Sequence, residues 1–489
     1  MAIKHLVALL SLLPGEVLTE TVLGAYIFHR HGDRTTKSWP PTSLTALGAD
    51  QVYVSGQWYR NRYIASNSTH TILNIAPDVA VLSQMSITAP VDNVLQASAE
   101  VFTQAIYPPA GSAATQTLAN GQEVQAPLNG YQYIPVNIVS SAASSSGAED
   151  NPWLQGSSGC AKAVVSSNEY FSSSEYLDLL NQTRDFYQGL LPVYNTTFDS
   201  SEATFKNAYA IFDYVHVSQI HNTSIPSDDL LTNDTLVQLQ TLANIHELGL
   251  AFNESEPVRA IAGAVLAAQI LDALNDTMES SLKKASAERF NVQFGAYASF
   301  MSFFGLSNLT TTSEDFKGIV DYASSMAFEL VTNATVNGTD APTTVSPDDV
   351  SVRFLFANGS ASDSAPAQEY PLFGQSETTI PWSDFVTNMQ KFAIGDTPSW
   401  CTACGNSTGV CASASSSGSG SDSGSGASSS SSKSRLSAGA AAAVGVCSLL
   451  GLVLLLILGA ALAGFRVVKK GKRGVAEPAA STVEAGKKA

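Results

Sequence analysis

The hydrophobic and polar positions of the first 110 residues predict alternating strands and helices. An apolar, β-prone run over residues 22–28 predicts a strand. From Leu44 to Tyr63 apolar positions recur with partial helical spacing, which predicts a helix. A short apolar run at Val79–Leu82 predicts a second strand, and Leu95–Ile106 predicts a helix that ends before two prolines. These elements predict a βαβ-like start.

The chain continues as a mixture of helices and strands up to about residue 411. Residues 150–285 are rich in helical patterns, and Val258–Met278 is the best of them because apolar side chains line one face. Three further strands are predicted: Arg289–Phe294, Val350–Phe356 and Tyr370–Phe373. An apolar helix to Leu306 follows the first of these. The pattern favours an α/β fold.

Two apolar segments at the ends of the chain resemble targeting sequences. Residues 1–19 hold a short apolar stretch that Pro14 and Gly15 break, which predicts a signal peptide. Residues 438–465 carry no charge and are long enough to span a bilayer. A basic segment, residues 466–489, follows at once, and the positive-inside rule places it in the cytosol. The sequence therefore predicts a single-pass type I membrane protein.

An ectodomain, residues 20–411, lies between these segments and is joined to the membrane span by a flexible stalk. The stalk, residues 412–434, is almost entirely Ser, Gly and Ala. We expect the ectodomain to be extracellular, at the cell membrane, or to face a vacuolar lumen. Twelve N-x-S/T sequons precede the apolar segment and support this location. They begin at Asn67, Asn181, Asn195, Asn222, Asn233, Asn253, Asn275, Asn308, Asn333, Asn337, Asn358 and Asn406.

Four of the five cysteines lie in the ectodomain, and the fifth, Cys447, lies in the apolar segment. Four secreted cysteines allow three pairings. A zinc site at the C-x-x-C pair lacks a second matching pair, so two disulfides are expected. The sequence leaves their pairing open among Cys160, Cys401, Cys404 and Cys411.

The formal net charge of the 489-residue chain is −17, which argues against a nucleic-acid partner. The same charge would not steer anionic substrates towards the protein. A phosphate site must therefore be a local basic island.

Such an island follows the first predicted strand, in the run from Phe28 to Thr35. His31 stands between Arg30 and Arg34. An imidazole can attack phosphorus, and guanidinium groups hold the non-bridging phosphate oxygens bidentately. We therefore expect a phosphorylated small molecule or phosphoester as the partner of this site, with no metal and no organic cofactor.

The run resembles the RHGxR signature of the histidine acid phosphatases, in the histidine phosphatase superfamily, and the segment from Leu44 to Tyr63 resembles the block that follows it. The resemblance implies the phosphoglycerate mutase-like fold. That fold has a central, mostly parallel sheet flanked by helices, with a helical cap insert at about 150–285. It also implies that His31 is the nucleophile and that Arg30 and Arg34 bind phosphate. His29 and Asp33 are then local supports.

Two further elements of that family are missing, which implies a weakened site. Val94 stands where the family has a third phosphate-binding arginine. Ala296 and Tyr297 stand where it has a phosphate-contacting histidine and a proton-donating aspartate. Losing a general acid costs about 10²–10⁴ in rate, and losing one preorganised donor costs about 10²–10³. We therefore expect slow turnover. Esters with activated leaving groups, which need no protonation, should lose the least rate.

Several residues remain as alternatives. Tyr297 can itself donate a proton, but the ordinary pKa of tyrosine, about 10, makes it a poor acid at low pH. Asp33, Glu100 and the His246–Glu247 dipeptide could replace the missing acid, although each is more often an ordinary solvated residue. His216 and His221 could line the cap side of a pocket or be structural. Arg353 could pair with a buried carboxylate. The competing function is a catalytically inactive ectodomain that binds or senses phosphate; the natural substrate and the oligomeric state stay open.

Overall fold

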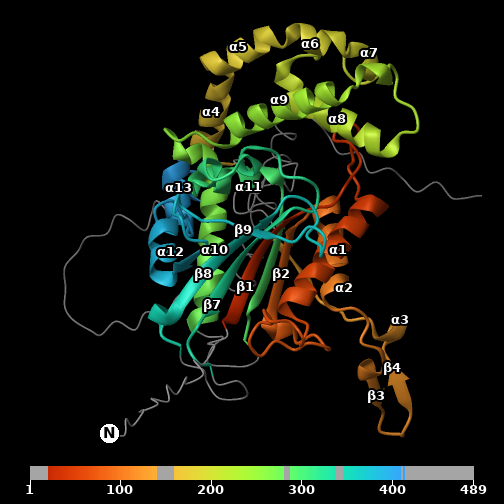
Figure 1. Cartoon of the computed structure of the whole chain (residues 1–489), viewed down its shortest axis with the longest axis vertical. Helices are drawn as coiled ribbons and strands as arrows, with labels where there is room; N and C mark the ends of the chain where they lie inside the picture. The colour runs from red at the N-terminus through yellow and green to blue at the C-terminus, as the bar shows by residue number, and fades with distance from the viewer. Residues whose placement is uncertain (1–19, 140–158, 280–286, 337–344, 409–410, 413–489) are drawn as a thin grey trace, which may run out of the picture. The chain divides into compact units, whose positions relative to one another are not determined.

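The structure is a computed structural model that describes residues 20–139, 159–279, 287–336, 345–408 and 411–412 (Figure 1). The predicted signal peptide, membrane span and tail, and the stalk beyond Ala412, lie outside these residues. Among the described residues one helix, Pro257–Glu279, is long and apolar enough to cross a membrane. Of the most apolar part of this helix, 67% is buried inside the protein, as expected for a core helix.

A sheet of eight strands forms the centre of the described chain, in the order β10-β8-β7-β1-β6-β2-β5, with β9 beside β8. Five strands run in one direction: β1 (Thr21–Arg30), β2 (Met85–Pro90), β5 (Val136–Val139), β6 (Phe290–Gly295) and β8 (Val350–Ala357). Three run the opposite way: β7 (Ser325–Thr332), β9 (Gln368–Glu369) and β10 (Thr379–Pro381). The predicted α/β class with a mostly parallel sheet is confirmed.

Strand β1 lies in the middle of the sheet because both of its faces are apolar. Val22, Ala25 and Ile27 pack into one hydrophobic core with helices α1 (Ala46–Tyr63) and α2 (Asn93–Ile106). Leu23, Tyr26 and Phe28 pack into a second core on the other face. That second core also contains α10 (Ile261–Glu279), α11 (Tyr297–Leu306) and α12 (Trp382–Met389). Helices therefore cover both faces of the sheet (Figure 1).

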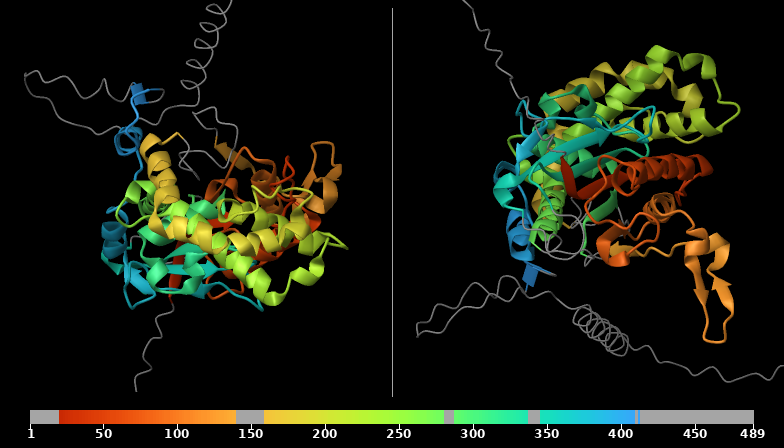
Figure 2. Two further views of the ribbon diagram at one scale, coloured as in Figure 1. Left: turned by 90° about the horizontal axis from the view of Figure 1, so that it is seen from above. Right: turned by 60° about the horizontal axis from the view of Figure 1, so that its bottom comes forward.

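A group of helices, here called the cap, lies over the end of the sheet where β1 ends (Figures 1 and 2). Its members are α4 (Ala161–Glu169), α5 (Ser174–Gln182), α6 (Arg184–Gly189), α7 (Leu191–Tyr194), α8 (Ala208–His221) and α9 (Asn233–Ala251). The cap has a hydrophobic core of its own, rich in tyrosine and phenylalanine. The expected limit of the insert near residue 285 is too late, because α10 is buried against β1 in the sheet layer.

Two predicted strands are wrong. Val79–Leu82 is not a strand because Val79, Val81 and Leu82 are exposed, whereas β2 begins three residues later with Met85, Ile87 and Ala89 buried on one face. Tyr370–Phe373 is not a strand either, since Phe373 has a left-handed φ of 59°. The helices predicted near residues 44–63, 95–106 and 258–278 and the strand near 289–294 are confirmed within a few residues.

A small hairpin, which the sequence pattern did not predict, projects away from the sheet (Figures 1 and 2). It consists of β3 (Thr115–Thr117), β4 (Glu123–Gln125) and the short α3 (Pro127–Gly130). The hairpin lies on the opposite side of the described chain from the cap and takes no part in the site described below.

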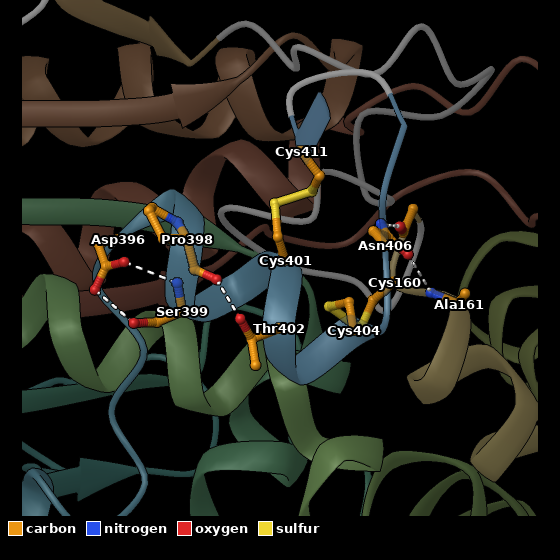
Figure 3. Close-up of a disulfide and its surroundings, with 11 residues drawn as sticks. Cys160, Ala161, Asp396, Pro398, Ser399, Cys401, Thr402, Cys404, Asn406 and Cys411 are labelled. Carbon is orange, nitrogen blue, oxygen red and sulfur yellow. Dashed lines mark hydrogen bonds between the residues drawn. A yellow bond between two sulfur atoms is a disulfide. The ribbon is translucent and has the colours of Figure 1, made fainter. Parts of the chain in front are cut away.

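Both disulfides meet at the last helix, α13 (Thr397–Cys404), which resolves the pairing (Figure 3). Cys160 is bonded to Cys404, and Cys401 is bonded to Cys411. The first bond ties α13 to the beginning of the cap, since Cys160 directly precedes α4. The prediction of two bridges is confirmed, and the alternative zinc site is excluded because all four thiols are bonded.

A buried carboxylate in β7 carries a compact charge network. Glu329 is fully buried and accepts hydrogen bonds from Arg62 (2.6 Å), Arg353 (3.1 Å) and the hydroxyl of Tyr63 (2.8 Å). Arg353 also contacts Glu20 at 2.5 Å. The prediction that Arg353 pairs with a buried carboxylate is confirmed. Two cations on one carboxylate compensate the cost of burying its charge.

Candidate active site

The turn that carries the motif is held by a close backbone contact with the start of α1. A side chain on Gly32 would lie 2.1 Å from the carbonyl oxygen of Gly48, and one on Gly48 would lie 2.0 Å from that of Asp33. Both positions therefore require glycine. The Thr45 hydroxyl caps α1 and donates a hydrogen bond of 2.5 Å to Asp33. These contacts join the Arg–His turn to the segment from Leu44 to Tyr63, so the two parts of the sequence hold each other in place.

His31 is buried directly after β1, and its ring orientation is fixed. Its Nδ1 lies 2.7 Å from the carbonyl oxygen of Gly32, so Nδ1 carries the proton and Nε2 keeps its lone pair. Burial, followed by the charges of Arg30 and Arg34, holds the pKa of His31 well below its ordinary value. A neutral imidazole with a bare Nε2 is the form that can act as a nucleophile.

Arg30 is buried beside His31 with much of its guanidinium uncommitted. Its Nη1 donates to the carbonyl of Val320, and its Nε has no hydrogen-bond partner among the described residues. The guanidinium carbon lies 4.7 Å from the ring centre of Tyr322 and 5.4 Å from that of Tyr297. Cation–π contacts orient the group without occupying its donors.

Arg34 is more heavily engaged, because a carboxylate from the cap binds it. Its Nη2 lies 2.9 Å from Asp213 and donates to the hydroxyl of Tyr209 at 3.1 Å, while Nη1 donates to the carbonyl of Thr35. Burial alone would raise the pKa of Asp213, but Arg34 and the hydrogen bonds hold it below its ordinary value. The Nε of Arg34 has no hydrogen-bond partner in the described chain.

A third cation, Lys37, completes the cluster. Its Nζ lies 5.7 Å from the ring centre of Tyr209 and 5.8 Å from that of Tyr297, and its charge contributes to the lowered pKa of His31. Sequence analysis missed Lys37. The available signal was its position three residues after Arg34 in the same turn.

Helix α8 brings His216 and His221, the two histidines whose role the sequence left undecided, to the motif. The Nε2 of His221 lies 2.6 Å from Asp33. His216 stacks on Phe212 at 5.5 Å, and burial lowers its pKa. A narrow cavity of about 20 Å³ lies between cap and motif and is lined by Arg30, Tyr209, Asp213, His216, Asp321 and Tyr322. His216 therefore lines the pocket, and His221 supports the motif.

His29 and Asp33 make the local contacts expected of supports. The imidazole of His29 lies 2.8 Å from the hydroxyl of Ser55, and burial lowers its pKa to about 4. Asp33 is fully buried and binds Thr45 and His221. Thr45 and His221 both bind Oδ2 of Asp33, whereas its Oδ1 is buried without a hydrogen-bond partner among the described residues.

Val94 begins α2 next to the motif. It is 2% exposed and lies one turn before Ser98, whose hydroxyl accepts a hydrogen bond of 3.3 Å from the backbone N–H of Gly32. This position can supply no charge. Glu100, on the same helix, is exposed and is not brought to the site.

Ala296 and Tyr297 stand at the start of α11, beside the arginines. Ala296 is buried and has no functional group. The hydroxyl of Tyr297 donates to Glu247 of α9 at 2.6 Å, and Glu247 lies 2.8 Å from Nδ1 of His246. The structure therefore brings one of the three alternative acids, Glu247, to the hydroxyl of Tyr297.

A family model for the histidine phosphatase superfamily, branch 2, matches residues 36–357. The chain belongs to this superfamily. The matched region begins after Arg34, so the assignment does not depend on the Arg–His motif. A search of the curated proteins found no match.

Solved structures of phytases share the fold of this histidine phosphatase. Those from Citrobacter braakii and Klebsiella sp. ASR1 are each 12% identical with a TM-score of 0.51, covering 78% of this chain and 99% of theirs. The Hafnia alvei phytase in complex with myo-inositol hexakis sulphate is 12% identical, with a TM-score of 0.50, covering 79% of this chain and 98% of its own. At this identity the likeness establishes the fold.

Proposed function

We propose that this histidine phosphatase hydrolyses phosphomonoesters through a phosphohistidine at His31, with weak turnover. The observation that carries the proposal is the neutral, buried imidazole of His31, whose Nδ1 is bound to a carbonyl beside Arg30 and Arg34. Nε2 attacks phosphorus, the bond to the leaving oxygen breaks, and that oxygen takes up a proton. Water then attacks the phosphohistidine and releases inorganic phosphate and the free imidazole.

Arg30, Arg34 and Lys37 supply the phosphate-binding charge in this proposal. Arg30 offers Nε and Nη2, and Arg34 offers Nε, while Lys37 partly replaces the arginine that is lost at Val94. The transition state spreads negative charge over the phosphoryl oxygens, so preorganised donors in a buried site stabilise it strongly.

The substrate class that we propose is a phosphoester of a small alcohol, including inositol phosphates. The phytase fold of the neighbours supports it, as does the binding of a hexakis-sulphated inositol by one of them. Asp213 of the cap and Asp321, which precedes β7, line the cavity and disfavour a ligand with many anionic groups outside the arginine cluster.

We also propose that the enzyme is anchored in the cell membrane by residues 438–465, with residues 20–411 outside the cell or in a vacuolar lumen. Eleven of the twelve sequon asparagines are among the described residues, and none of these eleven is buried. Two disulfides support the same location, because they persist in oxidising compartments.

A phosphate-binding protein without turnover is the second candidate. Asp213 neutralises part of the charge of Arg34, and the cavity of about 20 Å³ is narrow in this conformation. Under this proposal the site binds phosphate, but the cap does not admit an ester.

Hydrolysis of p-nitrophenyl phosphate from acid to neutral pH separates the two candidates. We expect slow hydrolysis that His31→Ala abolishes and that the matched control His70→Ala retains. Because the pKa of His31 is lowered, the rate should not fall as the pH drops through 6.5, the ordinary pKa of histidine. Equal rates in wild type and His31→Ala would refute the enzyme; phosphate binding would then be the next measurement.

A further inference from the structure

A chain of three hydrogen-bonded side chains ends at the arginine cluster and has no role in phosphate binding. The hydroxyl of Tyr297 lies 2.6 Å from Oε2 of Glu247, and Oε1 of Glu247 lies 2.8 Å from Nδ1 of His246. The three side chains come from α9 and α11 and are largely buried, with His246 at 7% and Glu247 at 14% side-chain exposure. Their placement beside the site calls for an explanation.

Tyr297 is the member of this chain that borders the phosphate position. Its ring centre lies 5.4 Å from the guanidinium carbon of Arg30 and 5.8 Å from Nζ of Lys37. The ring of Tyr209, which binds Arg34, lies 5.0 Å away. A phosphoryl group held by these cations would lie near the ring of Tyr297.

His246 fixes where Glu247 can hold a proton. The imidazole is enclosed by the rings of Tyr170, Phe171, Tyr176 and Phe205 at 5.4–6.4 Å. In the tautomer that carries its hydrogen on Nδ1, His246 donates to Oε1, and a proton on Glu247 then sits on Oε2. Oε2 is the oxygen that faces the hydroxyl of Tyr297. A protonated Glu247 thus donates to Tyr297, which frees the hydroxyl hydrogen of Tyr297 for another acceptor.

We propose that Tyr297 is the proton donor to the leaving oxygen and that Glu247 resupplies it; this inference rests on the proposed function. As the bond from phosphorus to the leaving oxygen breaks, the O–H proton of Tyr297 moves to that oxygen. The proton on Oε2 of Glu247 moves to the tyrosine oxygen and leaves a carboxylate. When water attacks the phosphohistidine, its proton returns by the same path, so the site is restored.

Tyr297 is the catalytic residue in this relay, whereas Glu247 and His246 are positioning residues that act through it. The relay occupies the place of the acid that the sequence lacks, but its carboxylate comes from the cap. Asp33 already binds Thr45 and His221 through Oδ2, and Glu100 is exposed on α2, whereas Glu247 is hydrogen-bonded to Tyr297 beside the arginines.

The test compares two esters in the full chain. The leaving group of p-nitrophenyl phosphate needs no proton, whereas that of glycerol 2-phosphate does. Tyr297→Phe should slow glycerol 2-phosphate hydrolysis by about 10²–10⁴ and change p-nitrophenyl phosphate hydrolysis by less than about tenfold. The matched control is Tyr187→Phe, which removes a cap hydroxyl that has no hydrogen-bond partner in the described chain. It should leave both rates unchanged.

Glu247→Gln gives a second readout that does not depend on removing the tyrosine. Glutamine can still bind the hydroxyl of Tyr297 but cannot supply a proton to it, so Glu247→Gln should slow glycerol 2-phosphate hydrolysis more than p-nitrophenyl phosphate hydrolysis. Equal slowing of both esters by Tyr297→Phe, or by Glu247→Gln, would overturn the relay while His31-dependent hydrolysis survives. If the wild-type chain hydrolyses neither ester, the proposed function fails and the relay fails with it.

Discussion

The ion pair between Arg34 and Asp213 is a buried connection between the motif and the cap. Its two atoms lie 2.9 Å apart, and the side chains are 1% and 3% exposed. Asp213 also accepts hydrogen bonds of 2.9 Å from the Thr36 hydroxyl and the Lys37 backbone N–H. Removing either charge alone leaves the other buried without a counterion, which costs about 3–5 kcal/mol of unfolding free energy.

A double-mutant cycle measures this connection. Arg34→Met should cost about 3–5 kcal/mol. Asp213→Asn should cost about 3 kcal/mol, at the lower end of that range, because the asparagine oxygen can still accept from Thr36 and Lys37. The double variant removes both charges, so its loss should fall short of the sum by about 2–3 kcal/mol.

Urea denaturation of the four proteins at neutral pH provides the free energies of unfolding. Near-equal slopes against urea concentration would show that the compared states expose similar surface. Losses that add to within about 0.5 kcal/mol would refute the reasoning, because independent sites behave in that way. The cap would then be held to the motif by packing alone.

Three further predictions concern stability. Replacing Cys160 and Cys404 by serine opens a loop with a sequence separation of 244 and should cost about 5 kcal/mol, against about 3 for the other disulfide, in denaturant titrations without reductant. Burial lowers the pKa of His29 to about 4 in the folded protein, so below pH 6.5 the folded protein binds fewer protons than the unfolded chain. The unfolding free energy should therefore fall by about 3 kcal/mol between pH 6.5 and pH 4. His29→Phe should remove this part of the pH dependence. Glu329→Gln leaves Arg62 without a carboxylate among the described residues and removes one partner of Arg353, which keeps Glu20 and Glu369, so it should lower the unfolding free energy by about 1.5–3 kcal/mol, measured by the same titration.

The central strand and the Arg–His turn could be predicted because their signals are local. Both faces of β1 are apolar, and the motif residues are neighbours in the sequence. The adjacent strand β7 was missed because Glu329 interrupts its apolar run. That charge is tolerated only through Arg62 and Arg353, which lie far away in the sequence. A pattern along one strand cannot reveal such compensation.

The rest of the site depends on contacts across the fold. Asp213 lies 179 residues after Arg34, and Glu247 lies 50 residues before Tyr297. Nothing in the local sequence marks Asp213 as a partner of the motif, because an acidic residue on a helix is usually solvated. Glu247 was considered as an acid for its chemistry, and only the packing of α9 against α11 brings it to Tyr297.

Trapping of the phosphorylated enzyme tests the central claim most directly. The protein is mixed with a ³²P-labelled phosphomonoester, quenched in denaturant at alkaline pH, where phosphohistidine is stable, and digested. The phosphohistidine mechanism predicts acid-labile label on the peptide that contains His31, and no label in His31→Ala. Label that persists in His31→Ala, or hydrolysis by the wild type without any labelled His31 peptide, would contradict it.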